Sequence, residues 1–100
     1  MRQDNESTAG PQLDEVAEYL RELGLAEHGD FYVRGRLPGT IPSSEHVAIS
    51  DRDGVFKVWY RDMGSQRVYL ETTDFDDARD RFVREAVALG KQRGRRMREV

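Results

Sequence analysis

Residues 46–72, which read HVAISDRDGVFKVWYRDMGSQRVYLET, decide the fold. Apolar and polar residues alternate through three short runs in this stretch, a pattern typical of half-buried strands. The sequences between the runs, Asp53-Gly54 and Asp62-Met63-Gly64, are typical of tight turns. We therefore predict an antiparallel meander with strands at about 46–51, 55–61 and 66–72.

The two turns also predict which residues face each other. A two-residue type I′ loop at Asp53-Gly54 places Ile49 opposite Val58 and Val47 opposite Tyr60. A three-residue loop at Asp62-Met63-Gly64 places Val58 opposite Val68 and Phe56 opposite Leu70. Together the registers predict an inner face of Val47, Ile49, Phe56, Val58, Tyr60, Val68 and Leu70. The outer face then holds His46, Ala48, Ser50, Lys57, Trp59, Arg61, Arg67, Tyr69 and Glu71.

A helix is predicted on each side of this meander. Apolar residues recur at helical spacing over about 11–23, after Pro11 in the first helical position. A second apolar stripe runs over 74–90, with Thr73 or Asp74 as the cap and Gly90 as the stop. Residues 31–34 are predicted as a further short strand, and the Pro- and Gly-rich segment 35–44 as a loop.

The predicted fold class is α+β, in the order α-β-β-β-β-α. A three- to four-stranded antiparallel sheet has its N- and C-terminal helices packed on one face, which gives a small domain one core. Residues 1–10 lack periodicity and are expected to form a disordered leader. The domain is expected to span 11–90, and the basic tail 91–100 to be frayed helix or disordered.

Composition excludes several kinds of site. The 100 residues contain no cysteine, which rules out disulfides, iron–sulfur ligation and thiolate catalysis. His28 and His46 are expected to be exposed polar residues, and we predict no metal site, no cofactor and no enzymatic activity. With no apolar run of about 20 residues and no apolar N-terminal stretch, we expect a cytoplasmic protein without a membrane span.

The outer face of the sheet is the first candidate binding site. Its aromatic residues Trp59 and Tyr69 lie among Lys57, Arg61 and Arg67 in the predicted alternation. Exposed Trp, Tyr and Arg together are typical of the energetic centre of a protein interface. The alternative is that Trp59 lies over an edge or is covered by the 35–44 loop.

An acidic cluster opens the predicted second helix. Capping and the helix dipole account for acids at such a position, and the arginines at 79, 81 and 84 interleave with them. The alternative is an acidic patch that docks a basic partner surface. Its members are Asp74, Asp76, Asp77 and Asp80.

Charge is unevenly distributed along the chain. Residues 1–30 hold eight acids against two arginines, whereas residues 81–100 hold seven basic residues against two acids. The basic end suggests an alternative function, a nucleic-acid-associated or regulatory protein that acts through its tail. The residues that would carry it are Lys91, Arg93, Arg95, Arg96 and Arg98.

The element order is similar to that of the double-stranded RNA-binding domain. In that family the last helix opens with lysines that face phosphates. Here that position holds Asp74, Asp76 and Asp77, which would repel a phosphate backbone. We therefore do not expect the folded domain to bind nucleic acid.

Residues 55–82 read VFKVWYRDMGSQRVYLETTDFDDARDRF. This run of an aromatic strand, a glycine hairpin, a second strand and a helix that opens Phe-Asp-Asp-Ala resembles small immunity proteins encoded beside bacterial polymorphic or contact-dependent toxins. The strand matches that family's pattern loosely, because Trp59 follows Val58. The resemblance covers about a third of the chain. It implies a cytoplasmic, non-enzymatic protein that binds one cognate toxin domain and blocks its catalytic cleft.

Overall fold

The computed structural model describes residues 9–37 and 41–98. The predicted α+β fold is confirmed, in the order helix, four strands, helix. Residues 1–8 of the predicted leader and 38–40 of the predicted loop lie outside the described residues. The elements are α1 (Pro11–Leu23), β1 (Phe31–Val33), β2 (Glu45–Arg52), β3 (Val55–Asp62), β4 (Ser65–Thr72) and α2 (Phe75–Gln92).

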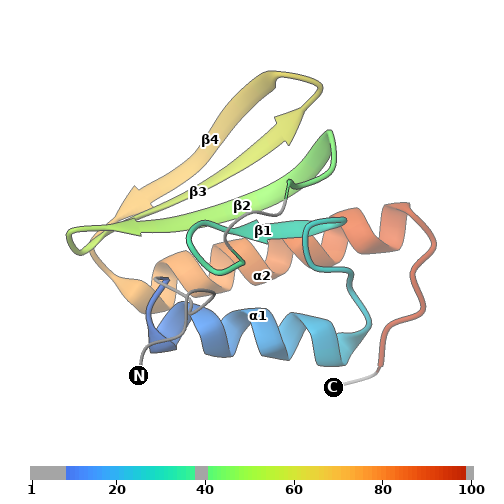
Figure 1. The fold of residues 1–100 in the computed structure, drawn as a ribbon, viewed down its shortest axis with the longest axis horizontal. Coiled ribbons are helices and arrows are strands. Elements are labelled where there is room, and N and C mark those ends of the chain that lie inside the picture. The colour runs from blue at the N-terminus through green and yellow to red at the C-terminus, as the bar shows by residue number, and fades with distance from the viewer. Residues whose placement is uncertain (1–8, 38–40, 99–100) are drawn as a thin grey trace.

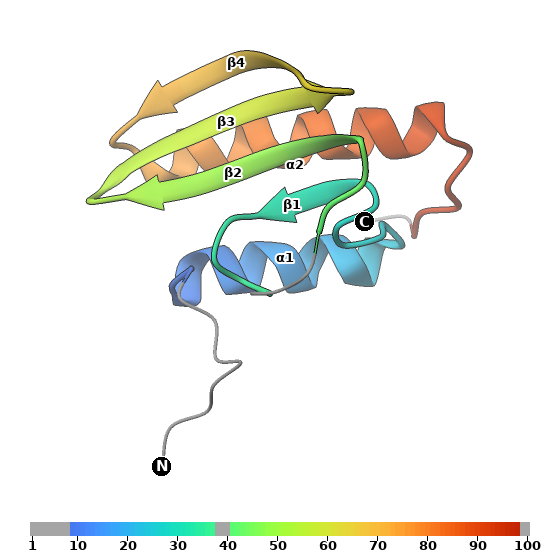
Figure 2. The ribbon, with the colours of Figure 1, turned by 45° about the horizontal axis from the view of Figure 1, so that its top comes forward.

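The molecule has two layers, with both helices on one face of a sheet whose strand order is β1-β2-β3-β4 (Figure 1). The sheet is antiparallel except at one edge, where β1 pairs with β2 in parallel. This parallel pair differs from the wholly antiparallel sheet that we predicted. Its cause is the long connection before β2, which carries the chain back to the end where β1 begins (Figure 2).

The first hairpin has the predicted register. Ile49 pairs with Val58 and Val47 with Tyr60, across a two-residue loop at Asp53-Gly54 in which both residues have positive φ. This is the type I′ geometry, whose twist matches that of the flanking strands.

The second hairpin differs from the prediction. Its loop contains two residues, Met63 and Gly64, both with positive φ, so that Asp62 pairs with Ser65. A β-bulge then shifts the register between Val58 and Trp59, and Val58 pairs with Leu70 where we predicted Val68. The bulge returns Leu70 to the helix side, whereas Val68 faces outward and is 47% exposed.

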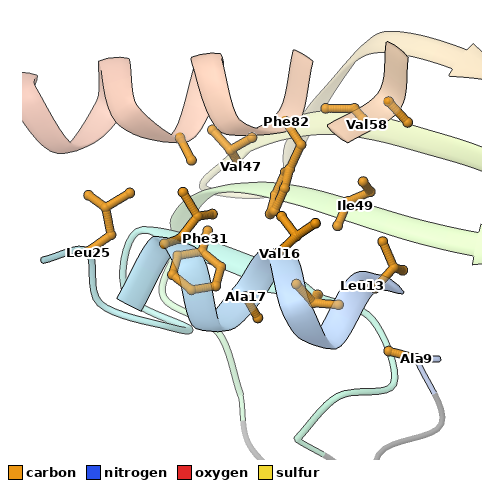
Figure 3. Packing of buried hydrophobic residues seen from close by; sticks show 14 of the residues in the cluster. Ala9, Leu13, Val16, Ala17, Leu25, Phe31, Val47, Ile49, Val58 and Phe82 are labelled. Carbon is orange, nitrogen blue, oxygen red and sulfur yellow. The ribbon is translucent and has the colours of Figure 1, made fainter. Parts of the chain in front are cut away.

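The core fills the space between the sheet and both helices. Figure 3 shows Phe82 reaching from α2 toward Val16 of α1 and Ile49 of β2. Phe82 is fully buried and meets the ring of Phe31 edge-on, with the ring centroids 6.1 Å apart. The helical stripes and the predicted inward residues of β2 and β3 therefore bury one another as expected.

Arg36 attaches the start of the β1–β2 connection to α1 through hydrogen bonds. Its guanidinium donates to Glu27 at 2.8 Å and to Asp14 at 3.0 Å, and it also bonds Glu18. The arginine is buried, and these bonds outweigh its desolvation, so the pKa of Arg36 rises above its ordinary value. Asp14 and Glu18 of α1, together with Glu27, therefore anchor the long connection.

Residues 91–98 contact the rest of the fold, where we predicted frayed helix or disorder, and residues 99–100 of the predicted tail lie outside the described residues. Helix α2 continues through Gly90, which is buried so close to Leu25 that a Cβ there would lie 2.3 Å from the Leu25 side chain. The chain then turns back and runs beside the end of α1 (Figure 1), where the backbone N–H of Arg98 donates to the Leu23 carbonyl at 2.9 Å. We call residues 93–98 the C-terminal strap.

Asp30 holds the strap in place. Its fully buried carboxylate accepts from Arg93 at 2.6 Å, from Arg95 at 2.8 Å and from the Ala26 N–H at 2.8 Å. Burial by itself would raise the pKa of Asp30, but the bonds from Arg95, Ala26 and Arg93 outweigh it and hold the pKa below the ordinary 3.8. Asp30 therefore stays charged in the folded protein.

We expect Asp30→Asn to lower the free energy of unfolding by about 3 kcal/mol, because it leaves two partly buried arginines without their counter-charge. Urea denaturation at pH 7 measures this loss. The matched control is Asp76→Asn, since Asp76 is exposed and pairs with Arg79 only at 3.5 Å; we expect a change under about 0.5 kcal/mol there. Equal losses in the two variants would contradict the role of Asp30.

Candidate functional site

The outer face of the sheet lies on the side away from both helices (Figure 1). Strand pairing arranges its side chains in three rows that cross the strands. The middle row is mostly apolar, and each flanking row carries at least one cation. The rows are His46, Arg61 and Gln66; Tyr32, Ala48, Trp59 and Val68; and Ser50, Lys57 and Glu71. Arg34, which follows β1, borders the same hollow as the third row and is counted with it.

Trp59 lies at the centre of this face but is only 5% exposed. Of the two alternatives, the exposed tryptophan is therefore wrong and the covered one is right in part, since Trp59 is not at an edge and cations lie over it. Two cations cover it. The Arg34 guanidinium lies 5.6 Å from the centroid of the indole and the Lys57 ammonium 5.4 Å from it, both within cation–π range. The tryptophan therefore orients the cations that stand over it.

Two hollows flank Trp59, and both also touch Arg34. The first, which we call the Tyr32 hollow, has a volume of about 550 Å³ and is bordered by residues 41–44, Tyr32, His46 and Arg61. The second, the Lys57 hollow, has a volume of about 500 Å³ and is bordered by Ser50, Lys57 and Glu71. The face thus offers shaped space on both sides of the indole.

Exposed apolar side chains mark the rim of the Tyr32 hollow. Ile41 is 87% exposed and Met63 is 80% exposed. They come from separate segments, the connection before β2 and the β3–β4 turn, which meet where the backbone N–H of Met63 donates to the Ser44 carbonyl at 2.8 Å. Apolar groups gathered in this way are typical of a surface that another molecule covers.

The cations of the outer face have no acidic partner among residues 9–37 and 41–98. Within the part of the chain that the structure describes, no carboxylate forms an ion pair with Arg34, Lys57 or Arg61, and Arg61 bonds only the amide of Gln66, at 3.4 Å. The protein as a whole carries a net charge of −3. The outer face is therefore locally positive on an acidic protein.

Two predicted members of the outer face lie on the other side. Arg67 pairs with Tyr60, whose side chain faces the helix layer, and directly paired residues share a face. Tyr69 stacks on Tyr60 with ring centroids 6.4 Å apart, beneath the Arg81 guanidinium of α2 at 4.8 Å. The two-residue turn causes both corrections, because it shifts the pairing of β4 by one residue before the bulge is reached.

The acidic cluster is explained by its own helix. Asp74 caps α2, since its side chain accepts from the Asp77 N–H at 3.1 Å. Arg79 lies 3.5 Å from Asp76 and 3.2 Å from Asp80. These local contacts match the capping interpretation, and the four aspartates do not join the outer face.

Of the five basic residues of the alternative function, two form ion pairs within the fold and three are exposed. Arg93 and Arg95 bind Asp30, and Arg93 also donates to the Glu45 carbonyl at 2.8 Å. Lys91, Arg96 and Arg98 are exposed. Two of the predicted nucleic-acid contacts are thus engaged within the fold.

Both histidines are buried, which corrects our expectation that they are exposed. The Tyr32 ring lies between them, with centroids 5.2 Å from His28 and 5.6 Å from His46. The Nδ1–H of His46 donates to the Ser43 carbonyl at 2.8 Å. Burial lowers the pKa of His46, and the positive charges of Arg61 and Arg93 lower it further, against the opposing effect of the Ser43 bond.

Tyr32 and Arg34 also belong to the outer face, although we did not predict them there. Their signal is present in the alternation of residues 31–34, where Phe31 and Val33 are buried and the residues between and after them face outward. The missing information was the position of β1 beside β2. Ile41 and Met63 carry no comparable signal, because each lies outside the strands.

Comparison of the chain with protein-family models, with curated proteins and with solved structures gives no match. Among the described residues, no three histidine or acidic side chains are grouped to hold a metal ion. Neither helix is long and apolar enough to cross a membrane, within the same residues. Function must therefore be inferred from the chemistry of the outer face.

We expect the protein to lose stability as the pH falls below 6.5, because the unfolded chain then binds a proton at His46 that the folded chain excludes. The loss levels off below the folded-state pKa of His46. Urea denaturation from pH 7 to pH 5 measures the slope. His46→Asn keeps an N–H donor for Ser43 but does not titrate, so its slope should be shallower; identical slopes would remove His46 as the cause.

Proposed function

We propose that the protein is a non-enzymatic protein-binding module whose interface is the outer face of the sheet. The observation that carries the proposal is the cluster of Arg34, Lys57 and Arg61 around Trp59, which has no carboxylate partner among the described residues. The buried indole holds Arg34 and Lys57 in position, and these cations gain energy when a partner supplies the opposite charge.

The specific form that we propose is an immunity protein, which binds and neutralises a cognate bacterial toxin domain in the cytoplasm. Residues 55–82, which resemble such proteins, supply β3, β4 and the first part of α2. Trp59 and the cations on β3 belong to the same run. The proposed interface therefore coincides with part of the region that carries the resemblance.

The alternative function through the basic tail has weaker support. Asp30 occupies Arg93 and Arg95, which leaves fewer cations to release counterions from a phosphate backbone. The cations of the outer face are the better candidates for binding, because they are held beside shaped hollows.

We expect Arg61→Glu to weaken binding to the toxin domain encoded beside this gene by roughly tenfold or more, because it reverses a charge at the rim of the interface. Isothermal titration calorimetry measures the affinity, and the residual activity of the toxin measures neutralisation. Arg61 is exposed and bonds only Gln66 among the described residues, so the variant should fold.

The matched control is Arg84→Glu, the same substitution at an exposed position of α2, in the helix layer. Its affinity should stay within about twofold of the wild type. Equal losses in the two variants would move the interface away from the outer face. A wild-type protein that neither binds nor neutralises the toxin would refute the immunity function.

A further inference from the structure

We infer that the outer face takes an extended segment of the partner protein with the pattern acid-x-apolar-x-acid. The inference rests on the proposed function and deepens it by naming the chemistry of the bound segment. It follows from the three rows of side chains that cross the outer face. The spacing of the rows, their charge and the rim of the Tyr32 hollow each support it.

The spacing of the rows is that of alternate residues in a strand. His46, Ala48 and Ser50 of β2 mark the three rows, two residues apart along one strand. Each step of two residues covers about 6.6 Å. An extended segment that runs along β2 and β3 presents its residues i, i+2 and i+4 to the same side at the same spacing. Each of these residues therefore meets one row.

The middle row is complementary to an apolar side chain of the bound segment. Tyr32, Ala48, Trp59 and Val68 form it. Ala48 and Trp59 are buried, whereas Val68 is 47% exposed. Ile41 and Met63 extend this apolar surface at one side of the Tyr32 hollow. A large apolar residue at i+2 would cover Val68, Ile41 and Met63, which are exposed to water.

Each flanking row is complementary to an acidic residue of the bound segment. One contains Arg61 beside His46, whose lowered pKa keeps it neutral at pH 7. The other contains Lys57 and the adjacent Arg34 against the single acid Glu71, so both rows carry an excess positive charge. Carboxylates at i and i+4 would supply the partners that these cations lack. The long side chains of Arg34 and Lys57 can reach a carboxylate while they keep contact with the indole.

A protein segment fits this surface better than the other possible occupants. The apolar rim formed by Ile41 and Met63 has no counterpart in a phosphate backbone, and single-stranded nucleic acids need aromatic faces that are open for stacking. The indole face of Trp59 is covered by cations. A second copy of this chain would bring the same positive surface against itself.

The test is selection of random 12-residue peptides displayed on phage, with the full chain as bait. We expect the enriched peptides to carry acid-x-apolar-x-acid and to be depleted at least tenfold when Arg61→Glu or Arg34→Glu replaces the wild type as bait. Arg84→Glu should recover them as the wild type does. Circular dichroism on each bait shows whether it is folded.

The binding of a selected, chemically synthesised peptide can be followed by fluorescence, because Trp59 is the only tryptophan. We expect saturable binding that weakens about tenfold with Arg61→Glu and with a peptide whose two acids are replaced by amides. Enrichment without acids at this spacing, or equal recovery on all baits, would overturn the inference. So would tighter binding of a 12-nucleotide oligothymidylate, or a dimer in light scattering that the peptide dissociates.

These outcomes are separate from those of the toxin experiment. If the toxin is neutralised but the peptides lack the pattern, the proposed function stands and the inference about the segment is wrong. If the pattern appears on the wild type and is lost on the Arg61→Glu bait while the toxin does not bind, the segment chemistry stands and the immunity function is wrong.

Discussion

The buried charge of Asp30 is the constraint on which the rest of the structure depends. A carboxylate with no exposed surface must be matched by donors, or its burial would cost several kcal/mol. Arg93, Arg95 and the Ala26 N–H supply them, so the α1–β1 connection and the C-terminal strap are held at one point. The carbonyl of Asp30 also accepts from the Val47 N–H at 3.2 Å, which brings β2 to the same point.

This constraint extends to the outer face. The hydroxyl of Ser43 donates to the Gly29 carbonyl at 2.8 Å, next to Asp30, and the backbone N–H of Ser43 donates to the His28 carbonyl at 2.7 Å. Residues 41–44, which border the Tyr32 hollow, are thereby attached to the segment that Asp30 fixes. Arg93 bonds Glu45 on the other side of them. The border of the proposed interface is therefore set from within the fold.

The parts of the fold that the sequence predicted well have local causes. Helix α1 begins at Pro11, and Asp53-Gly54 is a turn in which both residues readily take positive φ. The length of the β3–β4 turn does not follow from local sequence, because Asp62-Met63-Gly64 fits both a two- and a three-residue loop. A methionine at positive φ is uncommon, and the bulge that restores the position of Leu70 depends on packing against α2.

For the candidate site too, the sequence predicted the residues that share one strand but not the contacts between distant segments. Alternation along β3 placed Lys57, Trp59 and Arg61 together, because a single strand settles which residues share a face. The contribution of Arg34 depends on the parallel pairing of β1. The ion pairs of Asp30 join residues more than 60 positions apart, and no local pattern in the sequence signals them. The burial of His28 and His46 has the same non-local origin.

The bulge in β4 has a consequence for solubility. This strand is the edge of the sheet, and its free backbone groups could pair with another chain and start aggregation. A continuous edge of eight residues would be a good template, but the bulge interrupts its regular spacing, and the exposed cation Arg67 lies just before the interruption. The irregularity that returns Leu70 to the helix side also makes this edge a poor seed for intermolecular β-structure.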